Sequence, residues 1–268
     1  MTSSHPINTK YQNREIMTRI ISVSNHKGGV AKTTSVVNLG AGIANLGRKV
    51  LLIDMDPQAN LSVSLGVEDP EFSIYDGLRG DEELHPVTIF ENLDLVPSTL
   101  DLSGAEMELA SEAGREFILR ELIEPLTDNY DYIIIDCPPS LGLLTINAFT
   151  ASSEVFIPIQ PHYLAIKGLT KILEVVNKIK KRINKQIEIT GVFVTLFDRR
   201  KILHKDVYDI IESYFGERVF RAKIRENIAL AEAPSNGLDI FRYDKNSNGA
   251  FDYGRLAKEV VDMEKSKS

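Results

Sequence analysis

Residues 25–34 read NHKGGVAKTT, and this stretch decides how the chain folds. It follows RIISVS (19–24), a short apolar run of the kind that forms a buried strand. It leads into TTSVVNLGAGIANLG (33–47), where apolar residues recur at helical spacing and a glycine marks the end. A strand, a glycine-rich turn that ends in Lys-Thr, and a helix together form an arrangement that binds phosphate groups.

The loop offers both backbone donors and side chains to a nucleotide. Its backbone N–H groups can surround phosphate oxygens at the positive end of the following helix. Lys32 is predicted to reach the β- and γ-phosphates, Thr33 to hold Mg²⁺ through its hydroxyl, and Thr34 to reach the α-phosphate. The predicted backbone donors are Gly28, Gly29, Val30 and Ala31. A plain glycine turn is the alternative, but the glycine pair, the Lys-Thr-Thr end and both flanking patterns together favour nucleotide binding.

Three aspartates follow predicted strands. Phosphoryl transfer needs carboxylates that hold Mg²⁺ and orient water. Asp136 ends YIIID (132–136), and Asp54 and Asp56 lie two residues apart, so they face the same side if their strand continues. One such acid would be unremarkable at a strand end. Three of them beside a phosphate loop fit the edge at which open α/β sheets bind ligands.

The rest of the chain alternates continuous apolar runs with helical patterns, as in a parallel sheet that is covered on both faces. We therefore predict a doubly wound α/β fold with a mostly parallel sheet and helices on both faces. We expect a single domain over residues 19–268, preceded by a flexible tail of residues 1–18, and a loop-rich stretch at 66–92. Further strands are predicted at 49–54, 93–97, 130–139, 154–160 and 188–197, and further helices at 164–184, 203–215 and 250–264.

Composition narrows the class of protein. The 268 residues contain 43% hydrophobic residues and carry a net charge of −7, which is ordinary for a soluble domain and argues against a surface that binds nucleic acid everywhere. A local basic patch remains compatible with that charge. The single cysteine, Cys137, rules out an internal disulfide and fits a reducing cytoplasm. We find neither a secretory signal nor an apolar run long enough to span a membrane.

The loop resembles the deviant Walker A motif, K-G-G-x-G-K-T-T, of the ParA/MinD superfamily of ATPases. The resemblance covers about residues 19–262 and points to the ParA/Soj branch, through segments such as LLIDMDPQANLS, YDYIIIDCPPSLGLLTINAF and LAEAPSNGLDIFRYDKNSNGAFDYGRLAKEV. It implies a P-loop fold, ATP and Mg²⁺ as cofactors, and slow ATP hydrolysis that a partner stimulates.

The resemblance also implies roles for particular residues. Lys27 would reach across a homodimer to the nucleotide of the partner subunit. Asp56 would orient the attacking water, Asp136 would lie in the outer shell of Mg²⁺, and Asp54 would be structural or hold a magnesium-bound water. The expected catalytic set is therefore Lys27, Lys32, Asp56 and Asp136. The motif has glycine where this chain has Ala31, whose methyl would cost about 1 kcal/mol or more if φ there is positive.

By the same resemblance, Arg225 and Asn227 occupy positions that pack on the adenine. Many relatives have proline in place of Arg225, so only the backbone role carries over to that residue.

The family dimerises on ATP, coats nonspecific double-stranded DNA and is released by a ParB-type activator, so we expect a cytoplasmic, nucleoid-associated homodimer. We hypothesise that the tail of residues 1–18 contacts the activator. Clustered basic side chains suit DNA phosphates, although such runs are usually solvated faces. The candidate DNA-binding residues are Arg199, Arg200, Lys201, Lys205 and Lys223. Glu226 and Ala229 stand where relatives often carry arginines.

Other functions are compatible with parts of the sequence. A ParA-like ATPase that positions a protein cargo on the nucleoid fits the sequence equally well. A MinD-like membrane regulator fits less well, because LAKEVVDMEKSKS (256–268) has three lysines, three acids and no aromatic residue. One cysteine cannot supply the two ligands per subunit of a nitrogenase-type iron–sulfur reductase. A calcium loop at 244–255 is excluded by Arg255, which stands where glutamate is required.

Overall fold

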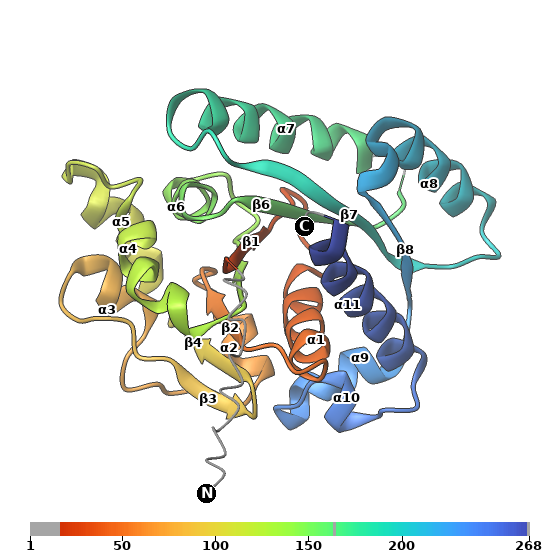
Figure 1. The fold of residues 1–268 in the computed structure, drawn as a ribbon, viewed down its shortest axis with the longest axis horizontal. Helices are drawn as coiled ribbons and strands as arrows, with labels where there is room; N and C mark the ends of the chain where they lie inside the picture. The colour runs from red at the N-terminus through yellow and green to blue at the C-terminus, as the bar shows by residue number, and fades with distance from the viewer. Residues whose placement is uncertain (1–16, 163–164, 267–268) are drawn as a thin grey trace, which may run out of the picture.

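The computed structural model describes residues 17–162 and 165–266, and it is built around one eight-stranded sheet (Figure 1). The strand order is β3-β4-β2-β5-β1-β6-β7-β8, and only β3 runs antiparallel to its neighbour, β4, at one edge. The strands are β1 (Arg19–Val23), β2 (Val50–Asp54), β3 (Val87–Phe90), β4 (Leu93–Val96), β5 (Tyr132–Asp136), β6 (Glu154–Ile159), β7 (Glu188–Phe197) and β8 (Val219–Arg225).

Helices cover both faces of the sheet, so the predicted doubly wound α/β fold is confirmed (Figure 1). One hydrophobic core packs α1 and α9 to α11 against one face, and a second packs α3 to α8 against the other. The helices are α1 (Lys32–Ala44), α2 (Asn60–Ser64), α3 (Ile74–Arg79), α4 (Leu102–Glu108), α5 (Ile118–Ile123), α6 (Leu143–Ala151), α7 (Ala165–Arg182), α8 (Ile202–Phe215), α9 (Ile228–Glu232), α10 (Ile240–Tyr243) and α11 (Asn248–Ser266). Among the described helices, none is both long and apolar enough to cross a membrane.

The central strands form where the sequence has uninterrupted β-branched and aliphatic runs. Every residue of β2, β5 and β6 is buried, because helices lie above and below them. β1 lies between β5 and β6, with Val23 in register with both Asp136 and Phe156. The carboxyl ends of β1, β2 and β5 therefore meet at one edge of the sheet, and the loop that follows β1 opens onto that edge.

Two strands lie outside the predicted ones. β8 was missed because Arg221 and Lys223 interrupt its apolar pattern, which alternates between buried and exposed positions as expected for a strand at the sheet edge. β3 lies within 66–92, which was predicted to be rich in loops; this stretch also contains α3. β3 is only partly buried, because it is the opposite edge strand.

The predicted tail of residues 1–18 lies outside the described residues apart from Met17 and Thr18. The Thr18 hydroxyl lies 2.7 Å from the carbonyl oxygen of Tyr130, to which it can donate a hydrogen bond. Thr18 is thus held against the domain at the amino end of β1, one residue before the predicted domain boundary.

Candidate nucleotide-binding site

The loop between β1 and α1 has the open backbone that a phosphate site requires. A Cβ atom built on Gly28 or Gly29 would meet no atom within 4 Å, so the space beside the loop is open on the side where side chains would stand. Gly29 has a φ of 73°, which glycine adopts without steric cost. Lys32 is only 8% exposed at the first position of α1, whereas Lys27 is half-buried.

Ala31 adopts the left-handed conformation, with φ 62° and ψ 38°, immediately before α1. The sequence predicted that the alanine methyl is unfavourable if φ is positive, and the observed φ of Ala31 is positive. No side chain among the described residues caps the N-terminus of α1. The first N–H groups of α1 therefore lack side-chain acceptors, which makes this helix end suited to an anion.

Hydrogen bonds to two neighbouring strands hold the loop in place. Asn25 donates a hydrogen bond from Nδ2 to the carbonyl oxygen of Pro158 on β6 at 2.7 Å, and its Oδ1 accepts one from the Lys27 N–H at 3.0 Å. Thr195 on β7 donates from its hydroxyl to the carbonyl oxygen of Val30 at 3.0 Å. Contacts with β6 and β7 therefore fix the position of the loop.

Thr33 and Asp136, predicted from separate motifs, lie in direct contact. The Thr33 hydroxyl donates a 2.6 Å hydrogen bond to Oδ2 of Asp136, and Asp136 is fully buried at the end of β5. Its other oxygen, Oδ1, has no hydrogen-bond partner among the described residues. A buried carboxylate oxygen without a partner, beside a hydroxyl, is chemically suited to a magnesium ion or to its bound water.

Burial raises the pKa of Asp136 well above its usual range, and the negative charge of Asp54 raises it further. The Thr33 hydrogen bond and the positive charge of Lys32 act in the opposite direction. A bound cation would favour the ionised form of Asp136 in the same way.

Asp54 and Asp56 differ in what they contact. Asp54 is fully buried and accepts three hydrogen bonds, from the Asp56 N–H, the Ser62 N–H and the Ser62 hydroxyl. Burial raises the pKa of Asp54 to about 6, despite those hydrogen bonds. Asp56 is 8% exposed and accepts one from the Gln58 N–H. Asp54 thus braces the segment that carries Asp56, and its oxygens are less available to a metal than Oδ1 of Asp136.

A cavity of about 470 Å³ lies beside the loop and brings in the C-terminal part of the chain. Its lining includes Ala31, Thr34, Arg225 and Asn227, so the residues expected at the phosphates and those expected at the base meet there. The Arg225 guanidinium makes two hydrogen bonds to Asp252 on α11, at 2.7 and 2.9 Å.

The turn that contains Asn227 and the end of β7 also line this cavity. The Asn227 side chain caps α9 by accepting a hydrogen bond from the Ala229 N–H. The Oδ1 atom of Asn227 is therefore engaged by its own helix. Leu196 on β7, which the sequence did not single out, also lines the cavity and has a φ of 50°.

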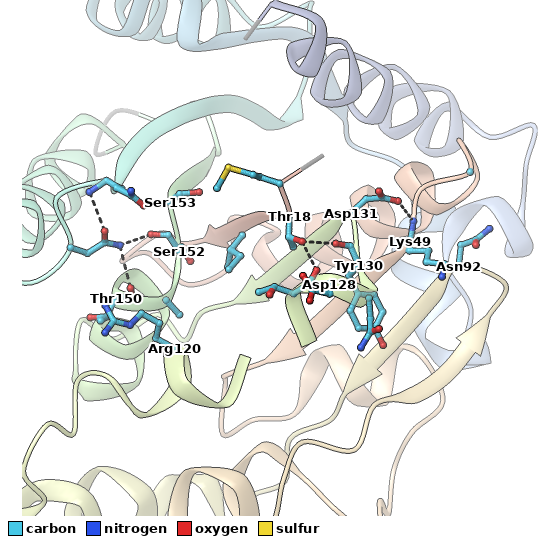
Figure 2. Close-up of a pocket in the computed structure, with 18 residues that line it drawn as sticks. Thr18, Lys49, Asn92, Arg120, Asp128, Tyr130, Asp131, Thr150, Ser152 and Ser153 are labelled. Atoms are coloured by element: carbon cyan, nitrogen blue, oxygen red, sulfur yellow. Dashed lines mark hydrogen bonds between the residues drawn. The ribbon is translucent and has the colours of Figure 1, made fainter. Parts of the chain in front are cut away.

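A second cavity, of about 980 Å³, lies at the opposite, amino edge of the sheet (Figure 2). Figure 2 shows Thr18, Lys49, Tyr130 and Ser152 around it. None of the predicted site residues lines it. The cavity at the carboxyl edge is therefore the one that matches the sequence motifs.

The predicted DNA-binding residues gather around the end of β7, α8 and the edge strand β8. Arg199, Lys201 and Lys205 are exposed. Arg200 is exposed as well, but its guanidinium pairs with Asp198 at 2.9 Å. The Lys223 ammonium lies 3.3 Å from the centre of the Tyr208 ring, and burial lowers its pKa. Lys223 is thus turned onto an aromatic ring, so its charge is less open to solvent than the other four.

His26 makes contacts that the sequence did not reveal. Its Nδ1 lies 3.1 Å from the carbonyl oxygen of Pro139, in the turn after β5, and Nζ of Lys171 on α7 lies 3.4 Å from its Nε2. These two contacts connect the loop to the turn after β5 and to α7. Only the position of His26 next to the lysine and glycine pair could have drawn attention to it.

Comparison with known proteins agrees with this geometry. A family model described as an AAA domain matches residues 18–189. The chain is 47% identical over 250 residues to the sporulation initiation inhibitor protein Soj of Bacillus subtilis, which covers 91% of this chain and 99% of that protein. It is 45% identical over 240 residues to the chromosome-partitioning ATPase Soj of Treponema pallidum, and this match covers 88% of this chain and 94% of that protein.

A solved structure with a similar fold is that of cobyrinic acid a,c-diamide synthase from Mycobacterium smegmatis with bound ADP and magnesium. The TM-score is 0.82 at 35% identity, over 94% of this chain and 97% of that chain. Both Soj proteins are more similar to this chain in sequence than this synthase is.

We expect Ala31→Gly to leave the free energy of unfolding unchanged or to raise it by up to about 1 kcal/mol, because glycine adopts a positive φ without strain. Urea unfolding of the nucleotide-free protein measures this. Ala41→Gly in the middle of α1 is the matched control and should lower the free energy of unfolding by about 1 kcal/mol or more. Equal losses at the two positions would contradict backbone strain at Ala31.

Asp136→Asn should stabilise the nucleotide-free protein more at pH 7 than at pH 5. Because the pKa of Asp136 is raised, the folded state binds its proton more tightly than the unfolded state, so the wild type loses stability as pH rises toward neutrality. Asparagine avoids the buried charge and can still accept from Thr33. Urea unfolding at both pH values measures the difference. As a control, Asp198→Asn should lower stability at both, since Arg200 lowers the pKa of Asp198. A pH-independent effect of Asp136→Asn would contradict a raised pKa of Asp136.

Proposed function

Because this chain belongs to the Soj/ParA family of chromosome-partitioning ATPases, we propose that it is an ATP-dependent dimerisation switch. In this proposal the dimer binds nonspecific DNA, and ATP hydrolysis, stimulated by a ParB-type partner, releases it and so partitions plasmid or chromosome DNA. The observation that supports the proposal best is the convergence of Lys32, Thr33 and Asp136 at the ends of β1 and β5.

The residues present fit Mg·ATP. The open glycine backbone and the uncapped N-terminus of α1 suit the phosphates, and Oδ1 of Asp136 is a buried acceptor without a partner among the described residues. Thr33 and Asp136 would hold Mg²⁺, or its water, and the bound ion would neutralise charge that develops on the phosphates. Lys32 would bind the terminal phosphates, and Thr34 the α-phosphate. The base would enter the cavity between Ala31 and the turn from Arg225 to Asn227.

Hydrolysis and dimer closure are assigned to two other residues. Asp56 has free acceptor capacity, because among the described residues only the Gln58 N–H donates to its carboxylate, and we assign it to the attacking water. Lys27 is held at its backbone by Asn25, and its ammonium makes no hydrogen bond or ion pair with the described residues. We assign its ammonium to the nucleotide of the partner subunit in a homodimer.

The DNA surface is assigned to the exposed cations at the end of β7 and the start of α8. Arg199, Lys201 and Lys205 extend from one turn and the helix that follows it. Their charges would contact phosphates without reading sequence, which suits binding to the nucleoid in the cytoplasm. The contact between the activator and residues 1–18 also stays a proposal, and it concerns residues almost all outside the described ones.

We expect Lys27→Ala to retain ATP binding but to lose ATP-dependent dimerisation, because its partner phosphate belongs to the other subunit. Asp56→Ala should accumulate the ATP dimer, because water is no longer activated. Light scattering coupled to gel filtration, with ATP, gives the mass, and phosphate release gives the rate. As a control, Lys258→Ala removes an exposed lysine that pairs with Asp262 on α11, and it should change neither readout. If Lys27→Ala still dimerised on ATP, Lys27 would not be the residue that contacts the nucleotide of the partner subunit.

A gel shift with random double-stranded DNA tests the function as a whole. We expect a shift with ATP, little with ADP or without nucleotide, and a loss of affinity of about tenfold or more between 50 and 200 mM salt. The double variant Arg199→Ala/Lys205→Ala should weaken the shift and reduce its dependence on salt, whereas Lys258→Ala should not. A shift that ignores the nucleotide would contradict the switch.

A further inference from the structure

A buried hydrogen-bond chain joins the C-terminal helix to the phosphate loop. The Tyr253 hydroxyl on α11 lies 3.0 Å from Oγ of Ser35, and this oxygen lies 2.6 Å from the carbonyl oxygen of Ala31. Tyr253 and Ser35 are both fully buried. The carbonyl can only accept, so Ser35 donates to it and must accept from Tyr253. The chain thus has one direction, from Tyr253 through Ser35 to Ala31.

These hydrogen bonds fix the plane of the peptide unit between Ala31 and Lys32. The peptide is planar and trans, so the Ala31 carbonyl and the Lys32 N–H point in opposite directions. With the carbonyl drawn toward Ser35 in the interior, the Lys32 N–H is directed toward the open side of the loop. On the preceding peptide, Thr195 donates to the Val30 carbonyl, which fixes the orientation of that peptide as well.

The strain at Ala31 makes this support necessary. An alanine at φ 62° loses about 1 kcal/mol relative to its preferred conformations, so the peptide tends to rotate away unless its carbonyl is held. The Ala31 carbonyl accepts from both the N–H and the hydroxyl of Ser35, at 3.0 and 2.6 Å. Burial raises the pKa of Tyr253, so its hydroxyl keeps the proton that it donates to Ser35.

We propose that Tyr253, acting through Ser35, is a positioning residue that aims the Lys32 N–H at the phosphates of the bound nucleotide. Tyr253 also lines the cavity proposed for the base, so a single side chain connects the two halves of the site. The inference rests on the proposed binding of ATP at this loop, and it adds a determinant of affinity from the last helix of the chain.

Tyr253→Phe tests the inference, because it removes the hydroxyl and keeps the buried ring. We expect the affinity for ATP to fall about 3- to 10-fold, as for the loss of one buried hydrogen bond, while the affinity for adenosine stays within about 2-fold. Both are measured by displacement of a fluorescent ATP analogue. Tyr75→Phe is the matched control, because it removes a tyrosine hydroxyl that donates to Glu108 outside the loop and the cavity. It should change neither affinity.

A second variant shows whether Tyr253 acts through Ser35. Ser35→Ala should weaken ATP binding at least as much as Tyr253→Phe, and the double variant should be no weaker than Ser35→Ala alone. Additive losses, or equal losses for ATP and adenosine, would overturn the inference, since Tyr253 would then act on the base. Wild-type affinity in both single variants would overturn it as well. A wild-type chain that binds no nucleotide would instead overturn the proposed function, and the inference with it.

Discussion

The hydrogen bond from the Thr33 hydroxyl to Asp136 joins the two halves of the chain's chemistry. Thr33 lies in the first turn of α1, and Asp136 ends β5, more than a hundred residues later, yet they are 2.6 Å apart. The contact exists because β1 and β5 are parallel neighbours, so the loop that leaves β1 opens beside the last residue of β5. The rest of the site is arranged around this point: the loop backbone on one side and Asp54 and Asp56 on the other.

The charges of the site suit a bound cation. Burial raises the pKa of both buried carboxylates, Asp54 and Asp136, and the negative charge of Asp54 raises that of Asp136 further. Lys32 offsets part of this repulsion. A protein gains nothing in stability from such an arrangement, so it fits a site whose electrostatics suit a magnesium nucleotide rather than the empty fold.

The C-terminal quarter of the chain contributes to the same site, and it packs in the hydrophobic core that contains α1. β8 leads to the turn from Arg225 to Asn227, and α11 places Asp252 against Arg225 and Tyr253 against Ser35. Neighbouring residues of one helix thus support the base side and the phosphate side together. A displacement of α11, which packs beside α1 on one face of the sheet, would therefore be felt at both (Figure 1).

The sequence by itself determined the fold class, the phosphate loop and the three aspartates, because each depends on local order: an apolar strand, a glycine turn, a helix, and acids at strand ends. It also indicated strain at Ala31, since alanine stands where the motif has glycine. Tertiary structure alone decided which acid keeps an unpartnered oxygen, that Lys223 turns onto Tyr208, and that His26, Ser35 and Tyr253 contact the loop or its neighbours. These depend on pairs distant in the chain, and β8 itself was missed because an edge strand exposes one face and lacks a continuous apolar run. Contacts of this kind form only when the sheet order brings their strands and helices together.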